Sequence, residues 1–281
     1  MTKTITQKFI FFSTGFFGEA VLKNILAQGI VPEYIITSPD RPVGRHQIIE
    51  AGPIKKLAIE HNIPFFQPEK LKTEESLEKF REIITPSTLC VVADYGKILP
   101  QELLDLNTVD FINIHPSLLP LFRGPAPLQN TILQDQRHTG ITIIQMDDKM
   151  DHGPIVAQKE YSINEDVWPL STPNLADVLA KESADILIET LEKYKNNTVI
   201  YLSQDHDATT YTKMIQKNDA EVFPTDNIKD IYRKYQAYKL WPGVFYMNKD
   251  SKRVKIKKMS SERIQRIVVE GKSESDFVDF M

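Results

Sequence analysis

Short apolar runs alternate with amphipathic stretches along the first half of the chain. The apolar runs predict buried strands at residues 9–12, 34–37, 89–93, 111–114 and 141–144. Apolar residues at helical spacing predict helices between them, at residues 19–28, 54–61, 74–83 and 128–133. Strands that alternate with helices in this way are typical of an α/β fold. We therefore expect a doubly wound, Rossmann-like domain with a mainly parallel sheet.

The loops at the carboxyl ends of these strands are the expected place for a ligand. Right-handed crossovers bring such loops to one edge of the sheet. In this chain they follow Phe12, Thr37, Ala93, Ile114 and Met146. Polar residues at these five places are therefore the first candidates for chemistry.

The pattern changes after a predicted helix at residues 175–195. The polar residues 196–210 carry the expected boundary between a first domain, 1–200, and a second domain, 205–281. The second domain is predicted to contain one helix and two or three strands, at 228–235, 244–246 and 253–257 among others. In the last of these, Val254 and Ile256 alternate with basic residues, as in a strand with one buried face.

The composition is that of an ordinary globular protein. Of the 281 residues, 41% are hydrophobic and 26% are charged, which excludes a disordered or fibrous chain. The single cysteine, Cys90, excludes an internal disulfide framework and a zinc site made of several cysteines. The longest apolar run near the N-terminus, residues 9–12, is too short for a secretion signal or a membrane span. We therefore expect a cytoplasmic protein without a membrane partner.

Charge is distributed unevenly along the chain. Residues 209–281 contain 15 Lys and Arg against 10 Asp and Glu, a net charge of +5. Since the whole chain carries −4, the remainder carries −9. A basic C-terminal part suits contact with a polyanion, and it equally suits a lysine-rich surface in solvent. Charge alone leaves both interpretations open.

Two candidate sites are weak on sequence grounds. The turn Thr14-Gly15-Phe16-Phe17-Gly18 follows the first strand and could receive an anion, but it lacks the full dinucleotide fingerprint. The acidic clusters at residues 147–152 and 205–207 contain carboxylates and imidazoles that could bind a divalent metal. Their spacing matches no standard metal site. We expect a tight turn in the first case and no metal in the second.

Asn113 and His115 form a third candidate site. They are two residues apart at the end of an apolar strand, so their side chains point to the same face. Pro116 then stops the strand. An amide donor beside an imidazole suits acyl transfer, since one polarises a carbonyl oxygen and the other handles a proton. A strand end capped by its own polar side chains would give the same pattern.

Residues 89–158 resemble the folate-dependent formyltransferases. The motifs that carry the resemblance are Tyr95-Gly96-Lys97-Ile98-Leu99-Pro100, Asn113-Ile114-His115-Pro116-Ser117-Leu118-Leu119-Pro120, Arg123-Gly124, Thr139-Gly140, Gln145-Met146-Asp147 and Met150-Asp151-His152-Gly153-Pro154. The resemblance implies catalysis by Asn113, His115 and Asp151, with 10-formyltetrahydrofolate as formyl donor and no metal. It also implies that folate lies against two segments, with contacts from Tyr95, Gly96, Ile98, Leu99, Ser117, Leu118, Leu119 and Pro120.

Other segments resemble one branch of this family, the methionyl-tRNA formyltransferases. These segments are Pro39-Asp40-Arg41-Pro42-Val43-Gly44-Arg45, similar to that branch's basic loop, and Tyr211-Thr212-Lys213, Lys217, Asp219-Ala220 and Trp241-Pro242-Gly243, similar to its OB-like C-terminal barrel. The resemblance implies formyl transfer to the α-amino group of methionyl-initiator-tRNA, and we expect a monomer. With the basic strand included, RNA contacts are expected at Arg41, Arg45, Arg123, Arg253, Lys255 and Lys257.

The chain departs from the family's patterns in several places. Ser13-Thr14-Gly15 stands where a G-T-P turn is usual, and Leu121 replaces the first arginine of an R-x-R-G motif. Asp94 stands where alanine is usual, and we expect it either to reach an edge of the pterin or to face solvent. The C-terminal part is short, which predicts a reduced barrel that lacks a hairpin.

Two other functions stay open on the sequence. A sugar-nucleotide formyltransferase would carry the same Asn, His and Asp trio, but it would have no use for Arg41, Arg45 and a basic C-terminal part. A non-catalytic RNA-binding protein on the same scaffold would need only the packing of the three polar residues. The acceptor of the formyl group discriminates between these functions.

Overall fold

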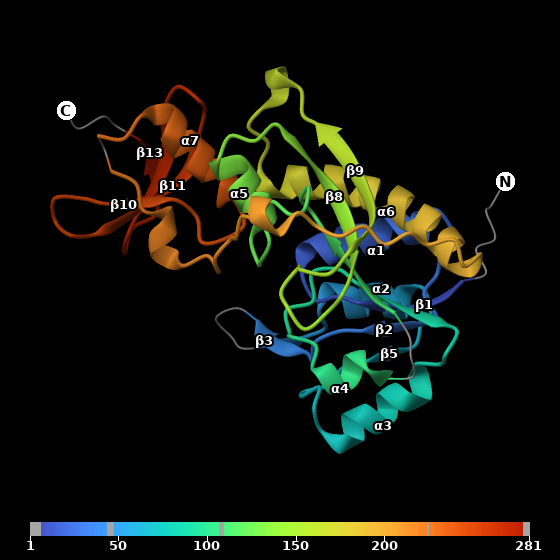
Figure 1. The fold of residues 1–281 in the computed structure, drawn as a ribbon. Helices are drawn as coiled ribbons and strands as arrows, with labels where there is room; N and C mark the ends of the chain where they lie inside the picture. Colours follow the sequence, from blue (N-terminus) through green and yellow to red (C-terminus); the bar gives the residue numbers. More distant parts are fainter. Residues whose placement is uncertain (1–6, 44–47, 107–109, 224, 278–281) are drawn as a thin grey trace. The chain divides into compact units, whose positions relative to one another are not determined.

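The computed structural model describes residues 7–43, 48–106, 110–223 and 225–277 (Figure 1). The chain divides into two compact units. The first contains Met1–Arg123, Gly140–Tyr161 and Ala176–Thr210, and the second contains Gly124–Thr139, Ser162–Leu175 and Tyr211–Met281. The assignment of two domains, 1–200 and 205–281, stays a prediction.

A seven-stranded sheet is built mainly from the first unit. Its strands, in spatial order, are β5 (Phe65–Phe66), β2 (Tyr34–Ile36), β1 (Lys8–Phe12), β6 (Thr88–Val92), β7 (Phe111–His115), β8 (His138–Gln145) and β9 (Ile155–Ser162). The strands from β5 to β7 pair in parallel, whereas β8 runs antiparallel to β7. The predicted α/β fold with a mainly parallel, doubly wound sheet is confirmed.

Helices α1 (Phe16–Ala27), α2 (Pro53–Glu60), α3 (Glu74–Ile83) and α4 (Gln101–Leu104) lie between these strands along the chain, and α6 (Thr172–Lys195) follows the last of them. Helix α3 has the bounds that the sequence predicts, because the Thr73 side chain caps it by accepting from the Ser76 amide and two glutamates occupy its first turn. Helix α1 begins at Phe16 rather than at residue 19, so its first turn adds the buried Phe17 and Gly18 to the apolar face.

The core of the sheet explains why its strands are readable from sequence. All five residues of β6 are buried, as a strand covered on both faces requires. Phe12 lies at the centre of an aromatic cluster, with ring centroids 6.1 Å from Phe80, 5.8 Å from Tyr95 and 5.8 Å from Phe111. Burial of Cys90 in this core raises the pKa of its thiol, so the thiol stays protonated.

The direction of β8 corrects one expectation. Gln145 at the end of β8 pairs with Ile112 at the start of β7, so the loop after Met146 leaves from the opposite edge to the loops that follow the parallel strands. Apolar periodicity carries no information on strand direction, which is why the pattern placed all five loops together. Strand β9 and the hairpin of β3 (Arg41–Val43) and β4 (Ile48–Glu50) were also absent from the prediction.

The second unit contains a four-stranded antiparallel sheet, consistent with a small, reduced barrel. Helices α5 (Pro127–Leu133) and α7 (Ile228–Ala237) belong to it, and its strands are β10 (Phe245–Met247), β11 (Arg253–Met259), β12 (Ile264–Val269) and β13 (Glu274–Asp276). The alternation predicted for β11 is confirmed, since Val254 and Ile256 are 1% and 4% exposed whereas Lys255 and Lys257 are exposed.

Candidate active site

The first unit brings the three predicted catalytic side chains together. Asn113 and His115 lie on β7, and Asp151 lies in the loop between β8 and β9. Asn113 Nδ2 donates a hydrogen bond to Asp151 Oδ1 at 3.2 Å, and His115 Nδ1 lies 3.7 Å from Asp151 Oδ2. One carboxylate therefore contacts both an amide and an imidazole that the strand places on the same face.

The hydrogen bond at the far side of the imidazole decides which nitrogen can accept a proton. His115 is 4% exposed, and its Nε2 lies 2.9 Å from the carbonyl oxygen of Phe122. Because a carbonyl oxygen can only accept, Nε2 carries a hydrogen. In the neutral imidazole the free lone pair is then on Nδ1, the nitrogen that faces Asp151.

The backbone of the loop that carries Asp151 is hydrogen-bonded to a residue far away in the sequence. Gln204 Nε2 donates to the carbonyl oxygens of Asp151 and Gly153, at 2.9 and 2.7 Å. Arg123 in turn donates to Gln204 Oε1 and lies 3.0 Å from His206 Nδ1. Arg123 is 1% exposed, so this buried side chain does not fit the interpretation of Arg123 as a contact for RNA phosphates.

The turn that follows β7 is fixed by the two neighbouring strands. Thr142 of β8 donates its hydroxyl to the Ser117 carbonyl and accepts from the Leu119 amide, at 2.7 and 3.0 Å. Gln158 of β9 donates to the Leu119 carbonyl at 2.9 Å. Gly140 of β8 allows this approach, because a Cβ there would lie 2.6 Å from Leu118 Cδ2 and 2.2 Å from a backbone oxygen of β9. The second predicted folate segment is thus a rigid turn.

The loop after β6 is tied to the start of α1 by Asp94. Its carbonyl accepts from the amides of Thr14 and Gly15, both at 3.0 Å, and its carboxylate accepts from the Phe17 amide at 3.1 Å. The carboxylate lies over Gly15, where a Cβ would meet it at 1.9 Å. Asp94 therefore lies at the positive end of α1, and it is exposed, as one of the two expectations for it states. Contact with the edge of the pterin stays a prediction.

Two effects act in opposite directions on the pKa of Asp94. Desolvation raises the pKa of its carboxyl group above the ordinary value, and the backbone hydrogen bonds from Phe17 and Gly18 oppose this rise. Much of the residue is nevertheless exposed, so solvent screens the effect. A carboxylate in this place leaves no room for a phosphate at the start of α1, in agreement with the tight turn expected there.

Among the described residues of the first predicted folate segment, Tyr95 has an unpaired buried hydroxyl and Ile98 has an exposed apolar side chain. The Tyr95 ring packs edge-on against Phe12, and its hydroxyl is buried without a hydrogen-bond partner in the described part of the chain. This burial raises the pKa of Tyr95 to about 12. Ile98 is 88% exposed although it is apolar, whereas Leu99 is 7% exposed. An orphaned hydroxyl and an uncovered apolar side chain in one loop are features of a surface that receives a ligand.

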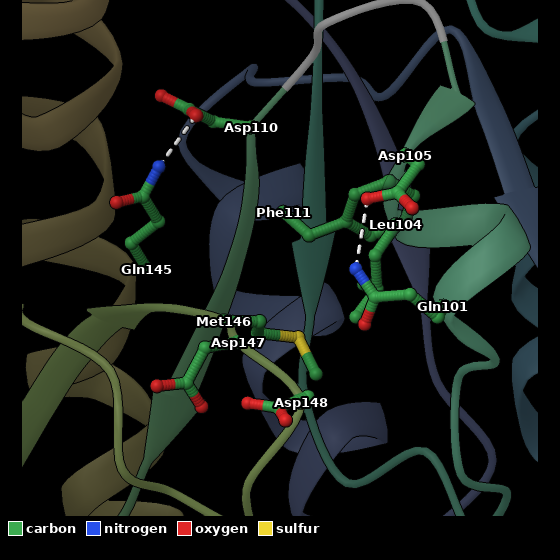
Figure 2. A pocket seen from close by; sticks show the side chains of 9 residues that line it. All are labelled: Gln101, Leu104, Asp105, Asp110, Phe111, Gln145, Met146, Asp147 and Asp148. Atoms are coloured by element: carbon green, nitrogen blue, oxygen red, sulfur yellow. Dashed lines mark hydrogen bonds between the residues drawn. The ribbon is translucent and has the colours of Figure 1, made fainter.

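A pocket of about 560 Å³ opens beside the start of β7. Figure 2 shows the nine residues that line it, which come from α4 and the residue after it, from the start of β7 and the residue before it, and from the end of β8 and the segment that follows. Hydrogen bonds from Gln145 to Asp110 and from Gln101 to Asp105 lie on two sides of it. Because Asp147 and Asp148 also line the pocket, it favours groups that donate hydrogen bonds over anionic ones.

Apart from the buried Arg123, the described residues that were expected to contact RNA lie on two surfaces. Arg41 is exposed on β3, and Arg45 lies outside the described residues. On β11 the guanidinium of Arg253 lies 4.2 Å from the centre of the Phe245 ring, and Lys255 and Lys257 are exposed. The nearby Arg266 is already paired with Glu274 and Asp276 of β13, which reduces the net positive charge of this surface.

The described residues offer neither a metal site nor a membrane-spanning helix. Within the described ranges, no three His, Cys, Asp or Glu side chains come together as a metal site. Of the acidic cluster at 147–152, Asp147 instead contacts the His152 imidazole at 2.6 Å. No helix among the described residues combines the length and the apolar character that a membrane span needs.

Comparison with known proteins agrees with this geometry. A family model described as formyl transferase matches residues 7–191. A methionyl-tRNA formyltransferase from Sulfurihydrogenibium sp. (strain YO3AOP1) is 36% identical over 244 residues, which are 87% of this chain and 77% of that protein.

Two solved structures share the fold. A sugar N-formyltransferase from Shewanella sp. FDAARGOS_354 superposes with a TM-score of 0.66 at 21% identity, over 92% of this chain and 99% of that one. HypX from Aquifex aeolicus, solved in complex with tetrahydrofolic acid, superposes with a TM-score of 0.62 at 15% identity, over 89% and 37% of the two chains. The chain therefore belongs to the formyl transferase family, in the branch of the methionyl-tRNA formyltransferases.

Proposed function

We propose that this protein transfers the formyl group of 10-formyltetrahydrofolate to the α-amino group of methionyl-initiator-tRNA and so supports translation initiation. The observation that carries the proposal is the cluster of Asn113, His115 and Asp151, in which one carboxylate contacts an amide donor and the proton-accepting nitrogen of a buried imidazole. The methionyl-tRNA formyltransferase relatives support the choice of acceptor.

The loops around the trio fit a folate. A pterin ring has flat apolar faces and edges that form hydrogen bonds, so it suits aliphatic side chains beside backbone amides. The uncovered Ile98 and the unpartnered Tyr95 hydroxyl offer such an apolar face and a polar contact. The turn at residues 117–120 follows the adjacent parallel strand, β7, so both segments leave the same edge of the sheet. We propose that folate lies against these two segments.

The trio can perform the proton and charge steps of acyl transfer. When bound, 10-formyltetrahydrofolate supplies the formyl carbonyl that the amine attacks. Asn113 has two amide hydrogens, of which one is donated to Asp151 and the other has no partner among the described residues. This second hydrogen can be donated to the carbonyl oxygen as negative charge develops on it. His115 Nδ1 would take the proton of the amine as the new bond to the formyl carbon forms, and Asp151 would stabilise the resulting imidazolium across 3.7 Å. His115 would then return that proton to the folate nitrogen when the bond between this nitrogen and the formyl carbon breaks, so tetrahydrofolate leaves and His115 is neutral again.

The basic surfaces would hold the RNA. Arg41 lies on the exposed hairpin of β3 and β4, which could place the acceptor end of the tRNA, and the β11 face with Arg253, Lys255 and Lys257 could contact phosphates. All three proposed catalytic side chains come from one chain, so a monomer suffices for the chemistry. Since charged initiator tRNA is consumed where translation starts, we place the reaction in the cytoplasm.

The choice of acceptor tests this proposal. The protein is incubated with 10-formyltetrahydrofolate and either methionyl-initiator-tRNA or a nucleotide-linked amino sugar, and the formylated products are separated and quantified. We expect formylmethionyl-tRNA to form and the sugar nucleotide to stay unmodified. Formylation of the sugar nucleotide alone, or of neither acceptor, would contradict the proposed function.

A further inference from the structure

Asp151 adopts a backbone conformation that needs support from its surroundings. Its φ is +50°, in the left-handed region that a residue with a Cβ rarely occupies. It belongs to the loop of residues 146–154 between β8 and β9, outside any regular element. The direction of its carboxylate toward His115 is therefore set by whatever fixes this loop.

Gln204 supplies that support from a distant part of the chain. Its side-chain NH₂ group donates to the carbonyl oxygens on both sides of the bend, those of Asp151 at 2.9 Å and Gly153 at 2.7 Å. Gln204 is 5% exposed, so water cannot replace these bonds at low cost. Both donors of one amide are thus used to hold the backbone of the residue that contacts His115.

Arg123 determines which way the Gln204 amide points. Arg123 Nε and Nη2 donate to Gln204 Oε1 at 3.1 and 2.6 Å, a forked contact that only the oxygen end of the amide can accept. The NH₂ end must then face the loop. The backbone amide of Arg123 also donates to the Thr210 carbonyl at 2.9 Å. Arg123 therefore holds the segment of residues 204–210 at two places, through its side chain at Gln204 and through its backbone at Thr210.

We propose that Gln204, oriented by Arg123, is a positioning residue for formyl transfer: it fixes Asp151 so that the carboxylate faces His115 Nδ1 and Asn113 Nδ2. This inference rests on the proposed function. Gln204 itself touches neither reacting group, so it acts only through Asp151. It should therefore affect the chemical step more than the binding of either substrate.

Substituting Gln204→Glu separates the two halves of this contact. The carboxylate keeps the length of the side chain and the acceptor for Arg123, but it replaces both donors to the loop by an acceptor. We expect kcat to fall by about ten- to a hundredfold, the size of effect that misplacing a reacting group by about 1 Å produces, while KM for both substrates stays within about threefold. Gln204→Met, which is uncharged and has no donor, should show the same selective loss if the glutamate variant folds poorly.

A double-mutant cycle tests whether Gln204 acts through Asp151. In an Asp151→Asn background, Gln204→Glu should lower kcat by less than about threefold further, because the carboxylate that it positions is already gone. Thr190→Val, which removes a buried hydroxyl that donates to Ile186 in α6, is the control for a general loss of packing. An equal fold-loss from Gln204→Glu in both backgrounds, or an unchanged kcat in the single variant, would overturn the inference.

Hydrogen exchange keeps the inference separate from the proposed function. The amides of residues 151–153 should exchange faster in both Gln204 variants than in the wild type or the Thr190→Val control, whichever acceptor the enzyme uses. Unchanged exchange there would refute the positioning role even if activity fell. A wild type that formylates no methionyl-tRNA would refute the proposed function while this measurement still decides the role of Gln204.

Discussion

Replacing Asn113 by alanine removes the only side-chain amide that contacts Asp151 from β7. The amide carries two hydrogens, one donated to Asp151 Oδ1 at 3.2 Å and the other available to the formyl oxygen. Loss of one such oxyanion donor lowers kcat by about 10²–10³, or about 3–4 kcal/mol. Because Gln204 still holds the backbone of Asp151, the loss should stay within this range.

Single-turnover formylation of methionyl-tRNA by Asn113→Ala, with both substrates saturating, measures this loss directly. Asn24→Ala is the matched control, since Asn24 Nδ2 also donates one hydrogen bond, to the Ala20 carbonyl in α1, but far from the trio along the chain. The control should keep the wild-type rate. A rate for folded Asn113→Ala within about threefold of the wild type would remove Asn113 from the mechanism.

Three further predictions address the donor site, the RNA surface and Asp94. A bound folate analogue should slow hydrogen exchange at the amides of residues 95–99 and 117–119, and protection of neither segment would show that the donor binds elsewhere. When Arg253, Lys255 and Lys257 of β11 become glutamine, the slope of the logarithm of the tRNA binding constant against the logarithm of salt concentration should become less steep by about 2 to 3. An unaltered slope would show that this face does not bind tRNA. The raised pKa of Asp94 means that ionisation opposes folding, so its stabilising contribution is present at low pH and is lost as pH rises. The melting temperature of Asp94→Asn minus that of the wild type should therefore increase as pH rises from about 4 to about 8. A difference that does not change with pH would contradict this reasoning.

The strands and the shared face of Asn113 and His115 could be predicted because they depend on local pattern. A strand buried on both faces must be apolar throughout, as β6 is, and side chains two apart on β7 must point the same way. The motif around Asp151 supplied the third member only through resemblance. Its contact with the other two depends on a loop whose path no local pattern specifies.

Contacts made across the fold could not be predicted in this way. Gln204 lies in the polar residues 196–210, where local composition indicates a connecting segment, yet it contacts a loop more than 50 residues away. Arg123 carries a charge that suggests an exposed site, but its side chain is buried and its guanidinium contacts Gln204 and His206 in the interior. Asp94 stands where alanine is usual, and the role of its carboxylate is visible only in the structure. The pairing of β1 with β6 brings Asp94, which follows β6, to the start of α1, which follows β1. In each case the partner is determined by tertiary structure.

The most direct measurement compares the wild type with His115→Ala in transfer of the formyl group from 10-formyltetrahydrofolate to methionyl-initiator-tRNA. His115 Nδ1 is the nitrogen that faces Asp151 with a free lone pair, and a positioned general base contributes about 10²–10⁴ in rate. We expect the wild type to form formylmethionyl-tRNA rapidly and the folded variant to form it at a rate at least about a hundredfold lower. Equal rates, or a wild type that leaves methionyl-tRNA unformylated, would contradict this expectation.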